Sequence, residues 1–357
     1  MSRYLLGLDA GTGSVRALLV DVESGRTTVA ARPWSHAPVP GEGGWAYDFD
    51  VERNRTLLAE AVREALRQAA AAPTEVAGIA ATSMRHNLVL LREGRAVFAV
   101  PNRDARPSAE AMEMAAGRGE ALYRSTGRWP SPVFLLPRLK WVGAHHPEWL
   151  EGSVALSIGD WVAFALCGEA ATDFSQAGES MIFDLHRREW MWDWIDELGL
   201  PRSLFPPALP SGTLLGKLIP SAGEELGLPP GIPVAVGGAD TQCALLGLGA
   251  LQPGEAALIA GTTAPVQMVV DRPLLDPDRR LWTGLHVLPD RWVVESNAGA
   301  MGEPLEWLAG LLYPESPQPV ARLMAEAARS RPGAGGLLST FGAQVFHAGA
   351  MGLPVGS

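Results

Sequence analysis

The stretch that decides the fold is LGLDAGTGSVRALLVD, residues 6–21 of this 357-residue chain. Apolar residues lead into Asp9, glycines break the run, and a second apolar run follows. This pattern predicts strands over 4–9 and 17–22 around a tight turn. The turn is either the end of a structural β-hairpin or a cradle for phosphate. In the second case its backbone N–H groups face the anion while the Asp9 carboxylate holds a metal ion.

The same pattern returns far along the chain, with position 260 in the place of position 10. AGTGSVRALLVD (10–21) aligns without gaps over AGTTAPVQMVVD (260–271), with identical Ala-Gly-Thr at the start and Val-Asp at the end. A chance match of two short hairpins is one interpretation. The other, which we favour, is two homologous domains that each present a Gly-Thr turn to a shared cleft. Because Ile259 stands where the first copy has Asp9, the two turns have different roles.

Strand and helix patterns alternate through the rest of the chain, which is typical of an α/β protein. Apolar spacing predicts helices over 51–71, 107–124, 137–144, 159–167 and 191–199, and strands over 27–33, 76–83, 256–260 and 266–270, with a hairpin over 87–100. The Pro- and Gly-rich segment 209–240 leads into a new strand at 233–236. We therefore expect two domains, 1–230 and 231–357.

Composition limits the classes of function. With 47% hydrophobic residues the chain can bury a sizeable core, and its formal net charge of -10 argues against a nucleic-acid partner. The two cysteines, Cys167 and Cys243, lie far apart in apolar surroundings, as expected for reduced thiols. The sequence shows neither a signal peptide nor a membrane span. We expect a cytoplasmic protein without a membrane partner.

Asp240 is the strongest candidate for chemistry. It follows a predicted strand and the pair Gly237-Gly238, and it precedes a predicted helix. Asp commonly caps helices, which is the structural interpretation. The chemical interpretation is a general base at the mouth of a cleft, where Gly238 lets a substrate hydroxyl approach closely. Neither Gly-rich turn has the Walker or dinucleotide-binding spacing, so the two turns would bracket phosphates in another way.

A series of motifs along the chain resembles the FGGY carbohydrate kinases. It comprises LGLDAGTGSVRALLVD (6–21), TSMRH (82–86), PNRDAR (101–106), TDFSQAGESMIFDL (172–185), GGADTQCALLGLGALQPGEAALIAGTT (237–263) and SNAGAMGEPLEWL (296–308). The resemblance runs in order across nearly the whole chain. It implies an α/β protein with a duplicated ribonuclease-H/actin-like ATPase fold, in which two domains hold ATP and the substrate between them.

The resemblance also implies roles for individual residues. Asp240 is expected to take the proton from the acceptor hydroxyl, and Asp9 and Asp240 are expected to hold Mg²⁺. The first phosphate turn would consist of Gly11, Thr12, Gly13 and Ser14, and the second of Gly261, Thr262 and Thr263. The acceptor would be bound by Arg85, His86, Asn102 and Asp104. Each of these four has a structural interpretation as an ordinary loop residue.

The expected function is that of an ATP-dependent kinase of a small sugar, polyol or related compound. Xylulokinases usually carry Gln-Met-His-Gly where this chain has Ser-Met-Arg-His, and the stretches 83–85 and 102–106 look closer to the autoinducer-2 kinases. Two alternatives stay open: a sugar-binding or regulatory homologue without catalysis, and an actin-like ATPase without a sugar acceptor. The polar stretches 82–87 and 101–106 favour a sugar site over the second.

Members of the resembled family continue beyond the point where this chain ends. GAGGLLSTFGAQVFHAGAMGLPVGS (333–357) lacks the Gly-Gly-Gly-Ala-Lys/Gln-Ser pattern that holds adenosine there. The chain is therefore expected to be a short or degenerate member or a fragment, which binds sugar better than ATP and turns over slowly. An incomplete second domain would expose core surface and favour self-association, for which a homodimer is the expected form.

Overall fold

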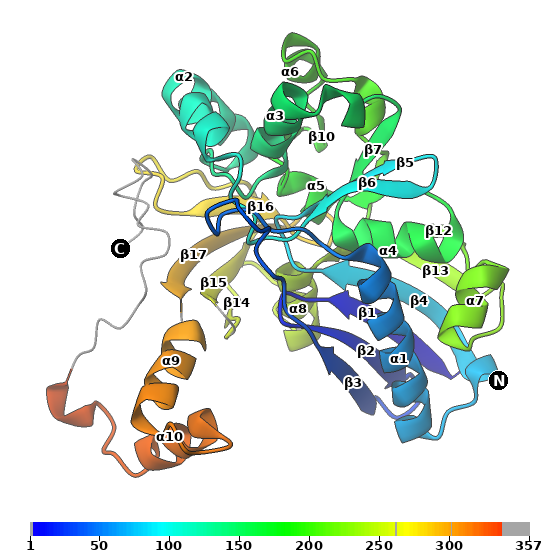
Figure 1. Cartoon of the computed structure of the whole chain (residues 1–357), viewed down its shortest axis with the longest axis vertical. Coiled ribbons are helices and arrows are strands. Elements are labelled where there is room, and N and C mark those ends of the chain that lie inside the picture. The colour runs from blue at the N-terminus through cyan, green and yellow to red at the C-terminus, as the bar shows by residue number, and fades with distance from the viewer. Residues whose placement is uncertain (1–2, 261–262, 301, 338–357) are drawn as a thin grey trace.

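A computed structural model describes residues 3–260, 263–300 and 302–337 of the chain (Figure 1). Within them the chain is a mixed α/β structure, as the sequence predicts. A six-stranded sheet lies near the N-terminus, and a four-stranded sheet is formed by later residues. In Figure 1 the first sheet is at the right, and a layer of helices joins the two sheets at the top.

The six-stranded sheet has the strand order β12-β13-β4-β1-β2-β3. β4 runs parallel to both β1 and β13, and the other neighbours are antiparallel. The strands are β1 (Tyr4–Ala10), β2 (Ser14–Asp21), β3 (Thr27–Pro33), β4 (Val76–Ser83), β12 (Leu214–Lys217) and β13 (Pro233–Ala239). The predicted hairpin around residues 11–13 is thus confirmed, and β1 also continues the sheet on its other side.

One face of this sheet carries the first hydrophobic core. Leu6 and Leu8 of β1 are buried, whereas Leu5, the neighbour of Leu6, is 47% exposed, because successive side chains of a strand point to opposite faces. Three helices converge over Leu8; they are α1 (Val51–Ala69), α4 (Ile158–Cys167) and α7 (Pro220–Leu226). Each aliphatic side chain buried in this way contributes about 1.5–3 kcal/mol.

A second core lies under a helical layer. Here β5 (Leu88–Arg92) pairs with β6 (Arg95–Val100) in the predicted hairpin, and β7 (Ser153–Leu156) completes a three-stranded sheet. The helices are α2 (Ser108–Thr126), α3 (Leu135–His145), α5 (Phe174–Gly178) and α6 (Trp192–Glu197). Two small ladders pair β8 (Thr172–Asp173) with β11 (Ala208–Leu209) and β9 (Phe183–Asp184) with β10 (Glu189–Trp190). Short 3₁₀ turns lie at Pro73–Glu75, Pro147–Trp149, Arg202–Leu204 and Ala334–Gly336.

The second large sheet has the order β14-β15-β17-β16. Its strands are β14 (Ala256–Leu258), β15 (Thr263–Val270), β16 (Trp282–Leu285) and β17 (Trp292–Ala300), with α8 (Asp240–Leu248) before them and α9 (Gly302–Leu312) and α10 (Pro319–Ala327) after them. β14 and β15 form an antiparallel hairpin, as the repeat predicts. The register is shifted by one residue, since Leu8 pairs with Ala17 but Leu258 pairs with Val266.

The expected domain boundary near 230 does not follow the sheets. β13 was expected to open the second domain, but it pairs with β4 and β12 inside the six-stranded sheet. The reason is that its strand lies parallel to β4 and completes the buried centre of the first sheet. The second sheet begins at Ala256, and the division into domains 1–230 and 231–357 stays a prediction.

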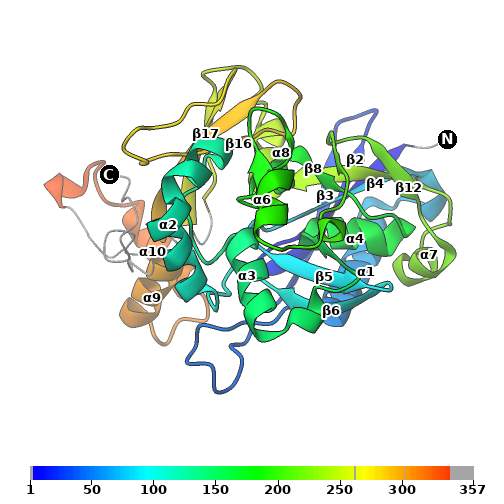
Figure 2. The ribbon, with the colours of Figure 1, turned by 90° about the horizontal axis from the view of Figure 1, so that it is seen from above.

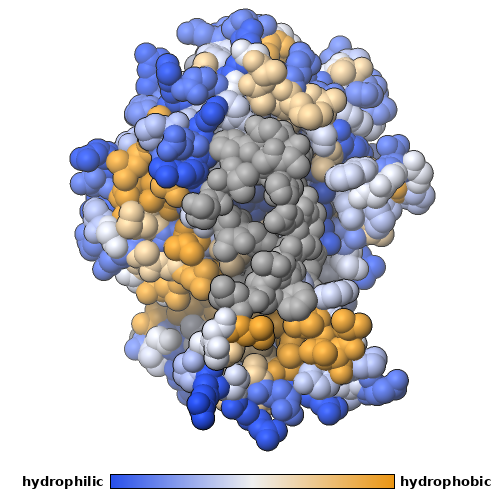
Figure 3. Space-filling model, turned by 90° about the vertical axis from the view of Figure 1, so that its left-hand side faces the viewer, coloured by the Kyte–Doolittle hydropathy of each residue, from blue (hydrophilic) through white to orange (hydrophobic). Residues whose placement is uncertain are grey.

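The two ends of the molecule differ in surface character. Figure 2 shows the first sheet with α7 at one end and the α9–α10 pair at the other. On the side that carries α9, apolar side chains gather at the surface (Figure 3), and Trp307, Leu311 and Leu312 are all exposed. Among the described residues, no helix combines the length and the apolar character needed to cross a bilayer.

Candidate active site

The topology of the first sheet brings Asp9 and Asp240 to one edge. β1, β4 and β13 run in the same direction, so their carboxyl ends meet at that edge. Asp9 pairs with Thr82, Thr82 pairs with Gly238, and Asp240 follows directly after β13. The Thr82 hydroxyl donates to the Gly238 carbonyl oxygen at 2.6 Å and ties the two strand ends together. Two carboxylates far apart in the sequence therefore share one site.

Asp240 is the first residue of α8, and Ala239 occupies the capping position before it. Its Oδ1 accepts the N–H of Thr241 at 2.7 Å and lies 4.0 Å from Nε of Arg85. The side chain is 36% exposed while protein surrounds its other sides. Burial, reinforced by the negative charge of Asp9, outweighs Arg85 and raises the pKa of Asp240 to about 7. This carboxyl can thus exchange a proton near neutral pH.

The two glycines before Asp240 serve the packing of strands. A Cβ atom at Gly237 would overlap the carbonyl oxygen of Ala81, and one at Gly238 would overlap Cγ1 of Val287. A larger residue at Gly237 would force β13 away from β4, and one at Gly238 would displace Val287, which follows β16. The structure therefore explains the glycine at position 238 by its packing against Val287. The sequence alone predicts the close approach of a substrate hydroxyl instead.

Asp9 faces the first turn with one oxygen free for a ligand. Its Oδ2 accepts a hydrogen bond from Nη1 of Arg16 at 2.7 Å, whereas its buried Oδ1 has no hydrogen-bond partner within the described chain. Burial raises the pKa of Asp9, and the positive charge of Arg16 opposes that shift. An unpartnered carboxylate oxygen beside a turn of backbone N–H groups fits a bound cation.

The turn between β1 and β2 is held in a fixed shape. The Gly11 N–H donates to the Ser14 carbonyl at 3.1 Å, and the indole N–H of Trp34 donates to the Gly11 carbonyl at 3.0 Å. A Cβ at Gly11 would lie 3.0 Å from the Ser14 carbonyl oxygen, whereas a Cβ at Gly13 would meet nothing within 4 Å. A side chain at Gly11 would therefore crowd the turn, whereas Gly13 borders open space.

The structure separates the four residues expected to bind the acceptor. The Asn102 amide donates to the Thr12 hydroxyl at 3.0 Å, which places Asn102 on the first turn. Asp104 is only 1% exposed, and its Oδ1 accepts the Tyr47 N–H at 3.0 Å and Nε of Arg106 at 2.6 Å. These contacts give Asp104 a structural role. Of the four, Arg85 lies beside Asp240. His86 contacts Glu179, which Arg85 also contacts.

Arg85 belongs to a group of buried charges, which we name the ion network: Arg85, Arg128, Glu179 and Glu295. Arg85 makes a bidentate pair with Glu295, with Nη1–Oε2 at 2.6 Å and Nη2–Oε1 at 2.9 Å, and its Nη1 lies 3.3 Å from Glu179 Oε1. Nη2 of Arg128 donates to Glu179 Oε1 at 2.6 Å. The network joins the loop after β4 to β17 of the second sheet.

Three further polar residues complete the surroundings of the ion network. Nε2 of His86 lies 2.9 Å from Glu179 Oε2, Gln242 Nε2 donates to Glu179 at 3.2 Å, and Gln267 Nε2 donates to Glu295 at 2.7 Å. Burial lowers the pKa of His86 despite the opposing effect of Glu179, so the ring is neutral near pH 7. Its backbone has a φ of 60°, a left-handed conformation that is uncommon outside glycine.

Sequence reasoning missed Glu179, Glu295, Arg128 and Gln242. A signal was available for Glu179 and Gln242, because both lie inside motifs that carry the family resemblance, at 172–185 and 237–263. Glu295 and Arg128 give no local signal. Their partners come from distant parts of the chain and are known only once the two sheets are placed together.

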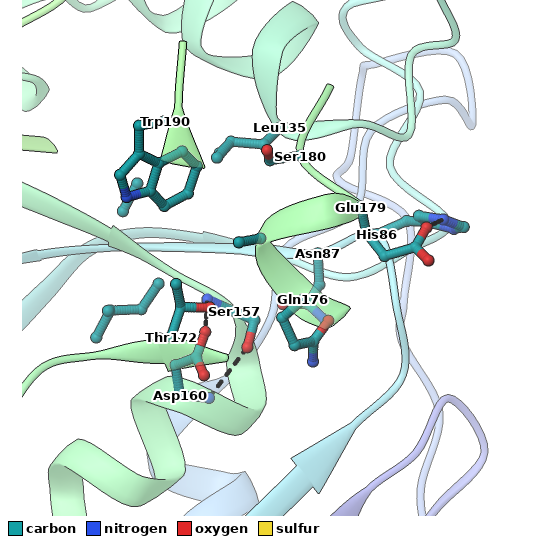
Figure 4. A pocket seen from close by; sticks show the side chains of 13 residues that line it. His86, Asn87, Leu135, Ser157, Asp160, Thr172, Gln176, Glu179, Ser180 and Trp190 are labelled. Carbon is teal, nitrogen blue, oxygen red and sulfur yellow. Dashed lines mark hydrogen bonds and ion pairs between the residues drawn. The ribbon is translucent and has the colours of Figure 1, made fainter. Parts of the chain in front are cut away.

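His86 and Glu179 are among the residues that line a small cavity (Figure 4). It has a volume of about 40 Å³, and Asp160, Gln176 and Ser157 are among its lining residues. The amide nitrogen of Gln176 is buried without a hydrogen-bond partner in the described chain. Burial raises the pKa of Asp160 to about 7. Because one water needs about 10–15 Å³ of space of this kind, the cavity suits a few waters and is too small for a sugar.

The predicted second phosphate turn falls mostly outside the described residues. Gly261 and Thr262 are not among them, and Thr263 is described only as the first backbone position of β15. The part of the prediction that the structure addresses is the hairpin on either side, since β14 and β15 pair as the sequence indicates.

The sequence matches a family profile over most of its length. Residues 4–247 match the N-terminal domain of the FGGY family of carbohydrate kinases. The autoinducer-2 kinase of Escherichia coli (strain K12) is 34% identical over 352 residues, which are 95% of this chain and 66% of that protein. The autoinducer-2 kinase of Photorhabdus laumondii is also 34% identical, with the same coverage. The chain thus spans 66% of the length of these curated relatives.

Solved structures agree with this grouping. The xylulose kinase from Rhodospirillum rubrum matches with a TM-score of 0.80 and 29% identity, over 94% of this chain and 69% of that one. Plasmodium falciparum glycerol kinase, solved with ADP, matches in fold with a TM-score of 0.78 at 18% identity, over 90% of this chain and 66% of that one. Profile, relatives and fold agree, and the chain belongs to the FGGY family of carbohydrate kinases.

Proposed function

We propose that this chain carries the acceptor site and the catalytic base of an enzyme that transfers the γ-phosphate of ATP to a hydroxyl group of a small sugar or polyol. The observation that carries the proposal is the Asp240 carboxyl. It is exposed at the carboxyl edge of three parallel strands, it interacts with Asp9 beside the first turn, and its pKa is raised to about 7.

Asp240 suits the role of general base. A base is most effective when its pKa lies near the working pH, since it must be ionised and yet hold a proton. At neutral pH a large fraction of the Asp240 carboxyls are ionised and can take the proton of the acceptor hydroxyl as its oxygen attacks the γ-phosphorus. The Thr241 N–H and the Arg85 guanidinium orient the ionised group.

Asp9 and the first turn suit a metal-bound nucleotide. Mg²⁺ is typically held by one or two carboxylates, together with waters and phosphate oxygens, so the unpartnered Oδ1 of Asp9 fits it. Asp240 as a second ligand stays a prediction. The bound ion would neutralise charge on the phosphate oxygens during transfer. The N–H groups of residues 11–14 and the open space at Gly13 suit the phosphates themselves.

The names of the relatives narrow the range of compounds that we consider as the acceptor. Curated relatives are autoinducer-2 kinases, and a similar structure is a xylulose kinase. We propose a xylulose-like ketose or an autoinducer-2-like compound, contacted by Arg85 and His86. Asn102 would act through Thr12 on the first turn. A cytoplasmic location and a homodimer stay predictions.

The proposal is tested by incubating the chain with Mg-ATP and an excess of each member of a panel of ketoses and polyols. We expect at least one compound to raise the melting temperature, since a ligand at a hundredfold excess over Kd stabilises by about 2.7 kcal/mol. Mass spectrometry should then detect its phosphorylated form, and D240N should not produce it.

The alternatives give different results in the same experiment. Binding of a sugar without any phosphorylated product would identify a sugar-binding homologue. ATP hydrolysis at one rate with and without every acceptor would identify an ATPase of the actin-like kind. Either result would replace the proposed function.

A further inference from the structure

The carboxyl end of β13, which leads into Asp240, contains an extra residue. Ala235 pairs with Ala80 of β4, whereas Gly238 pairs with Thr82. Two residues of β13 thus lie opposite one residue of β4. Because side chains alternate along a strand, an extra residue changes the faces to which the later side chains point. This bulge therefore helps to set the direction in which the chain presents Asp240.

Two side-chain hydroxyl groups hold the strand after the bulge. The Thr82 hydroxyl donates to the Gly238 carbonyl oxygen at 2.6 Å, and Oγ of Ser175 accepts the Ala239 N–H at 2.9 Å. This carbonyl and this N–H belong to one peptide unit, which is planar. The two contacts therefore fix the orientation of the peptide unit that comes directly before Asp240.

The Ser175 hydroxyl is itself held by Asp173. It donates its one hydrogen to Asp173 Oδ2 at 2.6 Å, which leaves its lone pairs for the Ala239 N–H. Asp173 caps α5 by accepting the N–H groups of Ser175 and Gln176 at 2.8 and 2.9 Å, and it also accepts the Ser211 hydroxyl at 2.9 Å. Ser175 and Asp173 are both fully buried. The hydroxyl that faces β13 therefore has a defined orientation.

The direction of the Asp240 carboxylate depends on its backbone. Within the described residues it has one hydrogen bond, from the neighbouring Thr241 N–H, and one ion pair, with Nε of Arg85 at 4.0 Å. A general base must come within about 2.6–3.2 Å of the group that gives up the proton. A misplacement of about 1 Å, caused at a distance from the reacting atoms, can cost about 10²-fold in rate. A fixed peptide unit before the base is therefore relevant to catalysis.

We propose that Ser175 and Thr82 are positioning residues for Asp240. Their hydroxyl groups clamp the peptide unit before it and thereby aim its carboxylate at the acceptor hydroxyl. This inference rests on the proposed function, because the acceptor hydroxyl belongs to that same site. Both hydroxyls already donate to protein groups, so their loss should slow phosphoryl transfer and change the binding of acceptor and nucleotide little.

The test removes one hydroxyl at a time from the full chain. S175A takes the acceptor away from the Ala239 N–H, and T82V keeps the shape of the side chain without its donor. Kinetics are measured with Mg-ATP and with D-xylulose, xylitol or glycerol, according to which of these the wild type phosphorylates fastest. We expect kcat to fall by about tenfold or more in each variant, with both KM values within about threefold of the wild type.

S211A is the matched control. Like S175A it removes a serine hydroxyl that donates to Asp173 Oδ2, but this hydroxyl does not contact the clamped peptide unit. We therefore expect S211A to keep the wild-type kcat. Melting temperatures report whether each variant is folded, and if S175A or T82V does not fold, the other variant decides the question.

A second readout asks whether the two hydroxyls act through Asp240. In D240N the base is already absent, so adding S175A or T82V should slow the residual transfer no further, because residues that act as a unit are not additive. The residual transfer is measured by mass spectrometry after long incubation. A further loss in the double variants would mean that the hydroxyls act in some other way, and it would overturn the inference.

The remaining outcomes separate the two proposals. An unchanged kcat in a folded S175A or T82V overturns the inference, as does an equal loss in S175A and S211A, and the kinase proposal stands in both cases. A rise in the acceptor KM as large as the fall in kcat would overturn it too, because the hydroxyls would then serve binding. If the wild type phosphorylates no ketose or polyol of the panel, the proposed function fails, and the inference fails with it.

Discussion

At the scale of single residues, we expect replacement of Asp240 to slow phosphoryl transfer without destabilising the fold. D240N keeps the shape of the side chain but cannot accept a proton. We expect it to lower phosphoryl transfer by about 10²–10⁴-fold with acceptor affinity retained. Turnover by mass spectrometry and acceptor affinity by NMR provide the measurement.

The melting temperature of D240N distinguishes the two interpretations of Asp240, as a general base and as a helix-capping residue. Because burial raises the pKa of Asp240, the folded state binds this proton more tightly than the unfolded state. This proton therefore contributes to the free energy of unfolding. The contribution is fully present when the pH is below the pKa of Asp240 in the unfolded chain, and it is lost as the pH rises through about 7. D240N should therefore melt no lower than the wild type at pH 8. A clearly lower melting temperature with normal turnover would support the structural interpretation.

The raised pKa also predicts the pH dependence of the reaction. The base must be ionised to act, so the rate of transfer at saturating substrate should rise between pH 6 and pH 8, with its half-maximum at about pH 7. The rate is measured at fixed Mg-ATP and ionic strength. A rate that is already flat from pH 5 upwards would mean that Asp240 titrates like an ordinary exposed carboxyl or is not the base.

Asp9 gives a prediction for the nucleotide side of the site. D9N keeps a group that can contact Arg16 but removes the charge that would hold a cation. We expect weaker Mg-ADP binding with acceptor binding nearly unchanged, measured by calorimetry with and without magnesium. Equal Mg-ADP affinity in D9N and wild type would mean that Asp9 does not hold the magnesium ion of the nucleotide.

The candidate residues show what a sequence can and cannot predict. Asp9 and Asp240 are predicted because each follows an apolar strand, and the parallel strands β1, β4 and β13 bring both to one sheet edge. Asp104 and Asn102 carry the same kind of polar side chain in a motif, yet they contact Arg106 and Thr12. Only side-chain contacts distinguish a ligand-binding group from one that supports a loop.

At the scale of elements, β13 depends on glycine. A side chain at Gly237 would overlap the Ala81 carbonyl, whereas one at Gly13 would meet nothing within 4 Å. We expect G237A to lose roughly 1–3 kcal/mol of unfolding free energy or more, as overpacked sites do. G13A is the matched control and should unfold within about 0.5 kcal/mol of the wild type. Urea unfolding measures both, and equal losses would contradict this account of the strand.

The elements themselves were largely predictable, and their assembly was not. Helical spacing from residue 51 predicted α1, and alternation predicted β1, β2 and the β5–β6 hairpin. The Pro- and Gly-rich composition of residues 209–240 predicts a domain boundary, but this segment contains β12 and β13, which pair within one sheet. Turn residues mark where strands end, and they carry no information on which sheet the next strand joins.

At the scale of the whole molecule, Arg85 and Glu295 connect the two large sheets. Arg85 follows β4 of the first sheet, and Glu295 lies on β17 of the second, where it pairs with Gln267 and Trp282. Thr283 on β16 donates its N–H to the carbonyl of Gly127, the residue after α2, at 3.2 Å, which ties the second sheet to the helical layer. The later sheet is therefore fixed to the earlier one at the edge where Asp240 lies.

This connection can be measured by a double-mutant cycle. Removing one member of a buried ion pair leaves an uncompensated charge and typically costs about 3–5 kcal/mol, whereas replacing both members by apolar residues of similar size costs much less. We expect R85M and E295L each to destabilise the chain strongly in urea, and R85M/E295L to lose clearly less than the sum of the two. Strictly additive losses would mean that the pair is not coupled in solution, and the second sheet would then be held mainly by its apolar contacts.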